Sequence, residues 1–179
     1  IGGNLYGYAM NDLAHPDDLL SVISQYEVVA KKLGIEICLN TEVHAKFMRS
    51  VLHQYDVCVV AAGASTDRTP FENMEGAELM VDAIEVAHGR VAAGRRVVVI
   101  GAGKIGLTLA EALRKNAGAE VTLVEKDKRI AGDVKPSFKW RHASWVEELA
   151  IPCLTLSRPV KVTKDGVTVR DGQGAETFL

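Results

Sequence analysis

The sequence predicts an α/β fold with a parallel sheet, and three observations lead to this prediction. Apolar runs such as residues 97–100 lack polar alternation, which is typical of strands buried on both faces of a sheet. Segments with apolar residues at steps of three and four separate these runs and are typical of helices that pack on a sheet. A glycine-rich turn at residues 101–106 joins one such strand to one such helix. With 179 residues, 47% hydrophobic and 25% charged, the chain has the composition of one folded domain or two small ones.

The first predicted helix covers residues 17–33. Its apolar residues recur at the spacing of one buried helical stripe: Leu19, Ile23, Tyr26, Ala30 and Leu33. Pro16 suits the first turn of a helix, and Gly34 suits a cap at its end. The β-rich residues 35–39 predict a strand after the glycine, and the periodic residues 45–54 predict a second short helix.

A second strand is predicted at residues 56–61, where an aspartate precedes a nearly continuous apolar run. Such a run is typical of a strand that is buried in a parallel sheet. It ends in three small residues that would let a backbone or a ligand approach closely, namely Ala62, Gly63 and Ala64. Taken alone, the segment also fits any buried strand that ends in a tight turn.

Residues 65–80 form the best candidate for a linker, because they carry Pro70 and Gly76 among polar residues and show little periodicity. Residues 81–91 then predict a short helix. The residues expected to face inward from this helix are Ala83, Val86 and Ala87.

The most informative segment begins at residue 94. Residues 97–100 predict a strand that leads into Gly-Ala-Gly-Lys-Ile-Gly at 101–106, and a helix follows to about Asn116, where Gly118 ends it. Residues 120–125 predict the next strand. Strand, glycine turn, helix and strand within about 30 residues form the βαβ unit of a Rossmann-like dinucleotide-binding domain.

Each glycine of this GxGxxG motif has a physical role in binding a dinucleotide. Gly101 permits the tight turn, Gly103 lets the backbone approach a pyrophosphate, and Gly106 lets the helix pack closely on the strand. The free amides and the partial positive charge of the helix N-terminus would hold the phosphates. We assign the pyrophosphate to five consecutive residues: Gly101, Ala102, Gly103, Lys104 and Ile105. The competing interpretation is a degenerate copy of the motif that holds no cofactor.

Glu125 indicates which cofactor the unit would bind. An acidic residue about 20 positions beyond the glycines accepts hydrogen bonds from the adenosine ribose hydroxyls. Its charge would repel the 2′-phosphate of NADP(H), so the sequence favours NAD(H) over NADP(H). Lys126, Lys128 and Arg129 follow directly, and their positive charges leave NADP(H) open as the alternative.

The remaining residues predict one more helix, one more strand and a β-meander. Pro136 fits the first turn of a helix over residues 136–150. The face expected to be buried consists of Phe138, Trp145 and Leu149, and Trp140 and Trp145 are interpreted as packing anchors. Residues 151–156 predict a strand. Alternating runs on either side of the turn at Asp165 and Gly166, with a third run after Gly174, predict the meander.

No metal site or catalytic residue is predicted. Cys38, Cys58 and Cys153 form no CxxC pair, so neither a disulfide framework nor a zinc site follows, and we interpret them as reduced core thiols. The five histidines show neither metal spacing nor a nucleophile partner, so we interpret them as surface or structural residues and assign no catalytic acid or base.

The charge distribution and the hydropathy of the chain limit the classes of partner that it could bind. Residues 1–93 carry six Lys and Arg against 13 Asp and Glu, whereas residues 94–179 carry 15 against 10. This basic excess suits an anionic small ligand, although chance explains it as well. It is too dispersed, and too poor in interleaved aromatic residues, for a nucleic-acid surface. No apolar run approaches the roughly 18 residues of a bilayer span, and the first residues lack the features of a secretory signal, so we expect a cytoplasmic location and no membrane partner.

The order of the motifs resembles that of flavoprotein reductases in which an NAD(P)H domain is inserted into an FAD domain. YDVCVVAAGAS is similar to the strand and turn that lead out of their FAD domain, although Ala62 stands where threonine is expected. RRVVVIGAGKIGLTLAEAL with AEVTLVEKDKRI resembles their second nucleotide fingerprint, and the opening GGNL resembles their GGxL segment. Within this class the chain most resembles the old-yellow-enzyme relatives of the 2,4-dienoyl-CoA reductase and trimethylamine dehydrogenase group. The resemblance lies in the opening GGN, the helix before IEICLNTEV and the short connection from AAGAS to the fingerprint.

This resemblance, which covers nearly the whole chain, implies a domain organisation. Residues 1–66 would form part of an FAD-type domain, residues 67–93 a linker and connecting helix, and residues 94–179 an NAD(P)-binding Rossmann-like domain that is incomplete at its C-terminus. The residues expected to line the FAD site are Gly2, Gly3 and Gly63.

The resemblance also implies a reaction, in which the parent enzyme passes hydride from NAD(P)H to FAD. An FMN and an iron–sulfur cluster would lie in the parent outside these residues. The glycine motif of the FAD domain and a returning strand after Leu179 are absent from the sequence, so we expect a fragment that is inactive alone and whose partners are the dinucleotide and the remaining domains of the parent.

Two alternatives remain at this stage. In a trimethylamine dehydrogenase-like enzyme, the same domain would hold an adenine nucleotide such as ADP as a structural element without turnover. A disulfide reductase of the thioredoxin-reductase kind would need a CxxC pair, which this sequence lacks.

Overall fold

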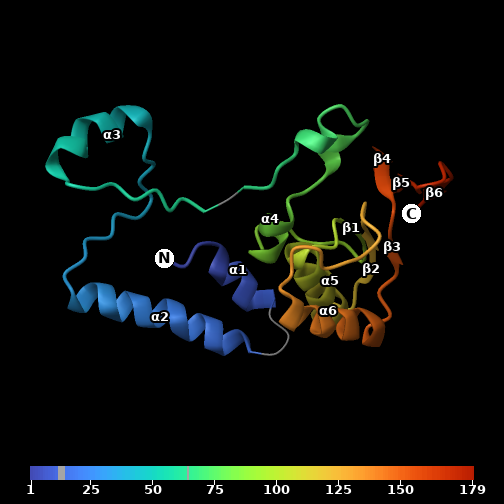
Figure 1. The fold of residues 1–179 in the computed structure, drawn as a ribbon, viewed down its shortest axis with the longest axis horizontal. Coiled ribbons are helices and arrows are strands. Elements are labelled where there is room, and N and C mark those ends of the chain that lie inside the picture. The colour runs from blue at the N-terminus through green and yellow to red at the C-terminus, as the bar shows by residue number, and fades with distance from the viewer. Residues whose placement is uncertain (12–14, 64) are drawn as a thin grey trace.

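The computed structural model describes residues 1–11, 15–63 and 65–179, so Ala64, the last of the small residues after the predicted second strand, lies outside the described residues. The described chain is an α/β protein with a parallel and an antiparallel sheet of three strands each (Figure 1). This arrangement confirms the predicted fold class. None of the helices in the described ranges is both long enough and apolar enough to span a bilayer.

The parallel sheet has the strand order β1-β2-β3, with β1 at Arg96–Ile100, β2 at Glu120–Val124 and β3 at Cys153–Leu154. Parallel neighbours need a crossover connection, and two helices supply it. The helix α5 (Lys104–Asn116) joins β1 to β2, and α6 (Pro136–Glu148) joins β2 to β3. Strands and helices therefore follow the order that the sequence predicts for this half of the chain.

The core of this half lies between the sheet and α5. Leu107 and Ala110 of α5 and Leu123 of β2 are fully buried in this core. The helices α5 and α6 lie side by side, because the guanidinium Nε of Arg114 donates a 3.0 Å hydrogen bond to the carbonyl of Leu149, just past the end of α6. Gly118, with φ of +64°, follows α5 in a backbone conformation that favours glycine.

The face of α6 that the sequence predicts to be buried is only partly so. Trp145 and Leu149 are half-buried, but Phe138 is 53% exposed. Trp140 is 68% exposed, and its indole Nε1 donates to the carbonyl of Ser137 on its own helix. The interpretation of Trp140 as a packing anchor is therefore wrong for this structure.

The C-terminal meander forms as predicted. Its strands β4 (Arg158–Val162), β5 (Val167–Arg170) and β6 (Glu176–Phe178) pair antiparallel in sequence order. At the first turn the amide of Thr163 donates to the carbonyl of Gly166, which closes the hairpin.

The predicted linker is docked on this meander. The amide of Val162 donates a 2.8 Å hydrogen bond to the carbonyl of Glu75, and the carboxylate of Glu75 pairs with the ammonium of Lys161. Gly76 has φ of +80°, and a Cβ there would overlap the carbonyl of Val162. Beyond this contact, α4 (Ala83–Ala87) is capped at its N-terminus by Asp82, whose carboxylate accepts from the amide of Ile84.

One edge of the parallel sheet is open in the described structure. Within the described residues, β1 is hydrogen-bonded to β2 alone. A cavity of about 750 Å³ runs along β1 between the linker and the first hairpin of the meander. No residue of the glycine-rich turn lines this cavity, so it is separate from the predicted dinucleotide site.

The N-terminal part is helical and loosely packed. The helix α2 (Pro16–Lys32) confirms the first predicted helix and contacts a further helix, α1 (Asn4–Asn11), which the sequence pattern did not indicate. Tyr26 and Leu33, both in the predicted stripe, are 64% and 68% exposed because α1 covers only part of α2. The short helix α3 (Ala45–Val51) extends away from the rest of the molecule (Figure 1).

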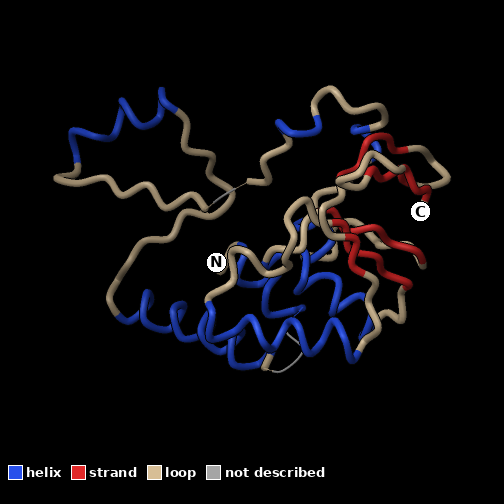
Figure 2. The backbone as a smooth tube through the Cα atoms, turned by 45° about the vertical axis from the view of Figure 1, so that its right-hand side comes forward, coloured by secondary structure: helices blue, strands red, loops and turns tan. Residues whose placement is uncertain are grey.

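The two strands predicted in this part do not form. Residues 35–39 and 56–61 run as loops on either side of α3 (Figure 2), and Val59 and Val60 are 81% and 86% exposed. A strand is stabilised by backbone hydrogen bonds to a neighbour, and no strand of the described chain lies beside either segment. For the same reason Cys38 and Cys58, interpreted as core thiols, are exposed.

Candidate nucleotide-binding site

The candidate site lies at the carboxyl ends of β1 and β2. Ile100 and Val124 are partners in the register of these strands, so Gly101 and Glu125 leave the sheet at the same level. The amide of Gly101 donates a 2.8 Å hydrogen bond to the carbonyl of Val124, which ties the turn to the neighbouring strand. Ligands of open parallel sheets bind outside the carboxyl ends of the strands, so this edge is where a dinucleotide would lie.

Two glycines of the turn occupy positions that reject a side chain or disfavour one. Gly101 has φ of +95°, a conformation that residues with a Cβ rarely adopt, and the space beside it is open. A Cβ on Gly106 would overlap the carbonyl oxygen of Gly101 and lie 3.3 Å from the Cγ1 of Val99. Gly106 therefore sets how closely the first turn of α5 approaches β1.

The carboxylate of Glu125 holds the turn from the side of β2. Its Oε2 accepts a 2.7 Å hydrogen bond from the amide of Ala102, and its Oε1 accepts a 2.9 Å hydrogen bond from the amide of Asp127. Glu125 is 8% exposed and Ala102 is fully buried. The structure thus brings together the two parts of the predicted site, the glycine-rich turn and the acidic residue at the end of β2.

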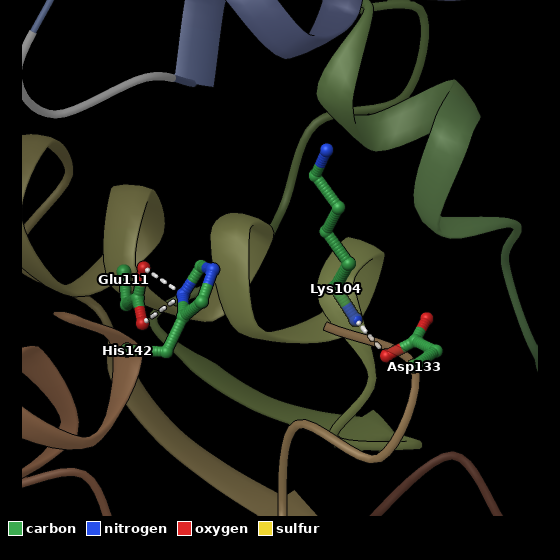
Figure 3. Close-up of polar contacts among 4 residues, drawn as sticks. All are labelled: Lys104, Glu111, Asp133 and His142. Carbon is green, nitrogen blue, oxygen red and sulfur yellow. Dashed lines mark hydrogen bonds and ion pairs between the residues drawn. The ribbon is translucent and has the colours of Figure 1, made fainter. Parts of the chain in front are cut away.

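A second carboxylate, which the sequence pattern did not indicate, lies at the N-terminus of α5. The Oδ1 of Asp133 accepts a 2.8 Å hydrogen bond from the amide of Lys104, as Figure 3 shows. A Cβ on Gly103 would lie 2.9 Å from both carboxylate oxygens, so the space beside this glycine is filled by Asp133. Asp133 belongs to the loop between β2 and α6, where no periodicity or motif could have indicated it.

The side chains of Lys104, Ile105 and Lys126 do not converge on the turn. The ammonium of Lys104 lies 5.4 Å from the ring centroid of Tyr8 in α1 and points away from Asp133 (Figure 3). Ile105 is 37% exposed, and Lys126 is exposed. The polar contacts of the turn are therefore made by its backbone amides rather than by cationic side chains. The amides of Gly101, Ala102 and Lys104 donate to the carbonyl of Val124, the carboxylate of Glu125 and the carboxylate of Asp133.

The three glycines assigned to an FAD site lie outside this cluster. Gly2 and Gly3 precede α1, with φ of +107° and +49°, and a Cβ on Gly2 would lie 2.8 Å from the Cδ1 of Ile23. Gly63, with φ of +77°, lies in the exposed segment that follows α3. No described atom lies within 4 Å of a Cβ built on Gly3 or Gly63.

A buried hydrogen-bonded pair lies between α5 and α6. The Nδ1 of His142 is 2.9 Å and 3.1 Å from the two carboxylate oxygens of Glu111, and both residues are buried (Figure 3). Burial raises the pKa of the Glu111 carboxyl, and the hydrogen bond from His142 opposes this rise in pKa. The ring of His142 also meets that of Trp145 edge to face, with centroids 6.1 Å apart.

This pair lies on the core side of α5, and the positions of its two residues in the sequence could have indicated that they are buried. Glu111 lies four residues after Leu107 in the buried stripe of α5, and His142 lies four residues after Phe138 in the predicted stripe of α6. When each of two facing apolar stripes contains one titratable residue, the two residues are expected to form a buried hydrogen-bonded pair. The interpretation of His142 as a structural residue is consistent with this position.

Within the ranges that the structure describes, no group of three or more His, Cys, Asp or Glu residues could hold a metal ion. The three cysteines are free thiols, and burial raises the pKa of Cys153.

Comparisons with known proteins address the family of the chain. The family model for pyridine nucleotide-disulphide oxidoreductases matches residues 9–178. Cinnamate reductase from Clostridium sporogenes is 33% identical over 130 residues, which cover 73% of this chain and 18% of that protein. The structure of a 2-naphthoyl-CoA reductase in complex with 2-naphthoyl-CoA matches with 28% identity and a TM-score of 0.86, over 99% of this chain and 26% of that one.

A more distant structure shows the same fold. The 6-hydroxypseudooxynicotine amine oxidase HisD from Pseudomonas geniculata is 18% identical, with a TM-score of 0.71, over 92% of this chain and 26% of that one. The chain therefore spans about a fifth to a quarter of the length of these relatives. Because the family model matches nearly every residue, the chain belongs to the pyridine nucleotide-disulphide oxidoreductase family, a family of flavin-dependent oxidoreductases that bind FAD and a pyridine nucleotide.

Proposed function

We propose that this chain is the pyridine-nucleotide-binding portion of a flavin-dependent oxidoreductase that passes hydride from NAD(P)H to FAD. One observation carries the proposal: the carboxylate of Glu125 holds the amide of Ala102, which fixes the glycine-rich turn at the edge of the sheet where dinucleotides bind. Residues 94–179 would form the nucleotide-binding domain, residues 67–93 the connection, and residues 1–66 part of the FAD-type domain.

The residues of the turn fit a pyrophosphate. The space beside Gly101 is open, and the amide of Lys104 already donates a hydrogen bond to an anionic group, the carboxylate of Asp133. An amide at the first turn of a helix that holds a carboxylate is equally suited to a phosphate oxygen. The residues that would hold the pyrophosphate are Gly101, Ala102, Gly103, Lys104 and Ile105.

Glu125 would orient the adenosine ribose. Each of its oxygens accepts one backbone amide, and each keeps a further lone pair for a ribose hydroxyl. Because both oxygens are fixed by backbone, the carboxylate could not turn away from a 2′-phosphate, and this favours NAD(H) over NADP(H). The exposed ammonium of Lys126 is the nearest residue in sequence that would oppose this preference.

The cofactors supply the redox chemistry, since the bound nicotinamide donates the hydride and the bound flavin accepts it. The residues of this chain contribute binding and orientation, and we assign no catalytic acid or base. Gly2, Gly3 and Gly63 are proposed to line the FAD site.

We place the parent enzyme among the old-yellow-enzyme relatives of the 2,4-dienoyl-CoA reductase and trimethylamine dehydrogenase group. The match over 99% of this chain to a 2-naphthoyl-CoA reductase, which by its name also acts on an acyl-CoA, supports this placement. An FMN and an iron–sulfur cluster would then lie in the parent outside these residues.

The test uses the full-length parent enzyme, with its flavin bound, under anaerobic conditions. NADH is expected to bleach the flavin absorbance, and Glu125→Ala is expected to weaken NADH binding by about tenfold, the loss typical of hydrogen bonds to a charged group. Glu120→Ala is the matched control, because Glu120 is an exposed glutamate at the other end of β2. If NADH leaves the flavin oxidised while ADP still binds, the domain is instead a structural module for an adenine nucleotide.

A further inference from the structure

Asp133 occupies the amide that the proposed function assigns to the pyrophosphate. Its carboxylate accepts from the backbone amide of Lys104 and lies beside Gly103, the glycine whose missing side chain would admit a phosphate. A carboxylate and a phosphate oxygen cannot both take the single hydrogen of this amide at full strength. The two anionic groups would also repel each other if both lay within hydrogen-bonding distance of this amide.

The backbone on both sides of Asp133 is anchored. The amide of Ala131 donates a 2.7 Å hydrogen bond to the carbonyl of Ala102, and the side chains of Ala131 and Val134 are both buried. Ala131 has φ of +59°, a left-handed conformation that costs a non-glycine residue about 1 kcal/mol or more. The loop thus holds a locally strained backbone conformation in the arrangement that places the carboxylate at the N-terminus of α5.

No cation neutralises Asp133 in the described structure. The ion pairs of the described residues do not include it, and the nearby ammonium of Lys104 lies over the ring of Tyr8 instead. The negative charge of Asp133 is therefore balanced only by the amide and by the partial positive charge of the α5 N-terminus. These are the same two features that would bind a diphosphate.

We propose that Asp133 is an internal competitor for the phosphate position and thereby sets the affinity of this site for nucleotides that carry a diphosphate. In the free protein its carboxylate satisfies the N-terminus of α5. Binding of the nucleotide exchanges one anion for another and displaces the carboxylate into solvent. This inference rests on the proposed function, because it requires that the turn binds a dinucleotide.

The variant Asp133→Asn separates charge from capping. The amide oxygen of asparagine can still accept from the amide of Lys104, so α5 keeps its cap, while the repulsion of a phosphate is removed. Asp133→Asn is therefore expected to bind ADP about three- to tenfold more tightly than the unchanged protein, the range of an anion effect at a helix N-terminus. Asp165→Asn is the matched control, because it removes the same charge from the remote turn between β4 and β5.

The experiment measures ADP and adenosine binding to the intact protein by calorimetry, at low salt and at about 1 M salt, where charge interactions are screened beyond about 3 Å. Tighter ADP binding by Asp133→Asn, with a smaller gain at high salt and no change for adenosine, supports the proposal. Equal or weaker ADP binding by Asp133→Asn overturns it, as does an equal gain for adenosine or for Asp165→Asn.

The failure of this inference is distinguishable from the failure of the proposed function. If the unchanged protein binds ADP and NADH but Asp133→Asn gains no affinity, only the competitor role of Asp133 is wrong. If the unchanged protein and Asp133→Asn bind neither ADP nor NADH, the proposed function is wrong and this inference falls with it.

Discussion

The amide of Ala102 donates a 2.7 Å hydrogen bond to the carboxylate of Glu125, so a side chain at the end of β2 fixes the turn that leaves β1. Both residues are buried, and the register of Ile100 with Val124 places them at the same edge of the sheet. The residue proposed to bind the ribose therefore has a second task, which is to hold the glycine-rich turn in place. Substitutions of Glu125 should therefore affect the free energy of unfolding and the affinity for NADH to different extents.

Glu125→Ala is expected to lower the free energy of unfolding by about 1–3 kcal/mol, because the buried amide of Ala102 loses its acceptor. Glu125→Gln keeps one acceptor oxygen and should cost less stability, although it too should weaken NADH binding because the charge is lost. Urea denaturation and calorimetry measure the two effects. If both variants unfold like the unchanged protein, the hydrogen bond does not hold the turn.

Gly106→Ala is expected to destabilise the protein by about 3 kcal/mol, since its Cβ would overlap the backbone carbonyl of Gly101 and neither α5 nor β1 can yield freely. Gly132→Ala is the matched control, because Gly132 is exposed and no described atom lies within 4 Å of a Cβ built there. It should change stability by less than about 0.5 kcal/mol. Thermal unfolding of both variants tests the difference, and similar midpoints would contradict the close approach of helix and strand.

Gly76→Ala is expected to detach the linker from the meander, because its Cβ would overlap the carbonyl of Val162. Gly89 offers a matched control: its φ is +70°, close to the +80° of Gly76, but no described atom lies within 4 Å of a Cβ built there. Gly89→Ala should cost only about 1 kcal/mol of backbone strain. Amide hydrogen exchange at Val162, which donates to Glu75, should accelerate in Gly76→Ala alone. Equal exchange in both variants would show that the linker stays docked.

Much of the C-terminal half could be predicted because its signals are local. The helix α5, the GxGxxG turn and the hairpin turn at Gly166 are each specified by residues close together in sequence, and each forms where it was expected. The strand predicted at residues 56–61 does not form, because a strand also needs a neighbour, and the sequence of a segment does not state whether one is present.

The site was predictable in part for the same reason. Glu125 meets the turn because the parallel strands β1 and β2 end at the same edge of the sheet, and the spacing in the sequence is enough to predict this. Asp133 contacts Lys104 from a loop in which Ala131 has a positive φ, and no pattern of polarity indicates that conformation. Glu111 and His142 each lie in an apolar stripe, a signal that the sequence analysis did not use, and which titratable residues meet depends on how α5 and α6 pack.

The pair of Glu111 and His142 predicts a pH-dependent stability. Burial raises the pKa of Glu111 and the hydrogen bond from His142 opposes the rise, so His142→Phe, which keeps a ring against Trp145, should raise this pKa further. A carboxyl with a raised pKa in the folded state takes up a proton on folding, and the stability it allows is lost as the pH rises through that raised value. His142→Phe should therefore lower the free energy of unfolding by about 3 kcal/mol at pH 8, where the buried Glu111 carboxylate is charged and unpaired, and by less at pH 5.

Glu111→Gln should remove this pH dependence, whereas Glu147→Gln, which changes an exposed glutamate of α6, should leave it intact. Urea denaturation at both pH values measures the effect, and an equal loss for His142→Phe at pH 5 and pH 8 would show that the pair contributes packing but no charge interaction.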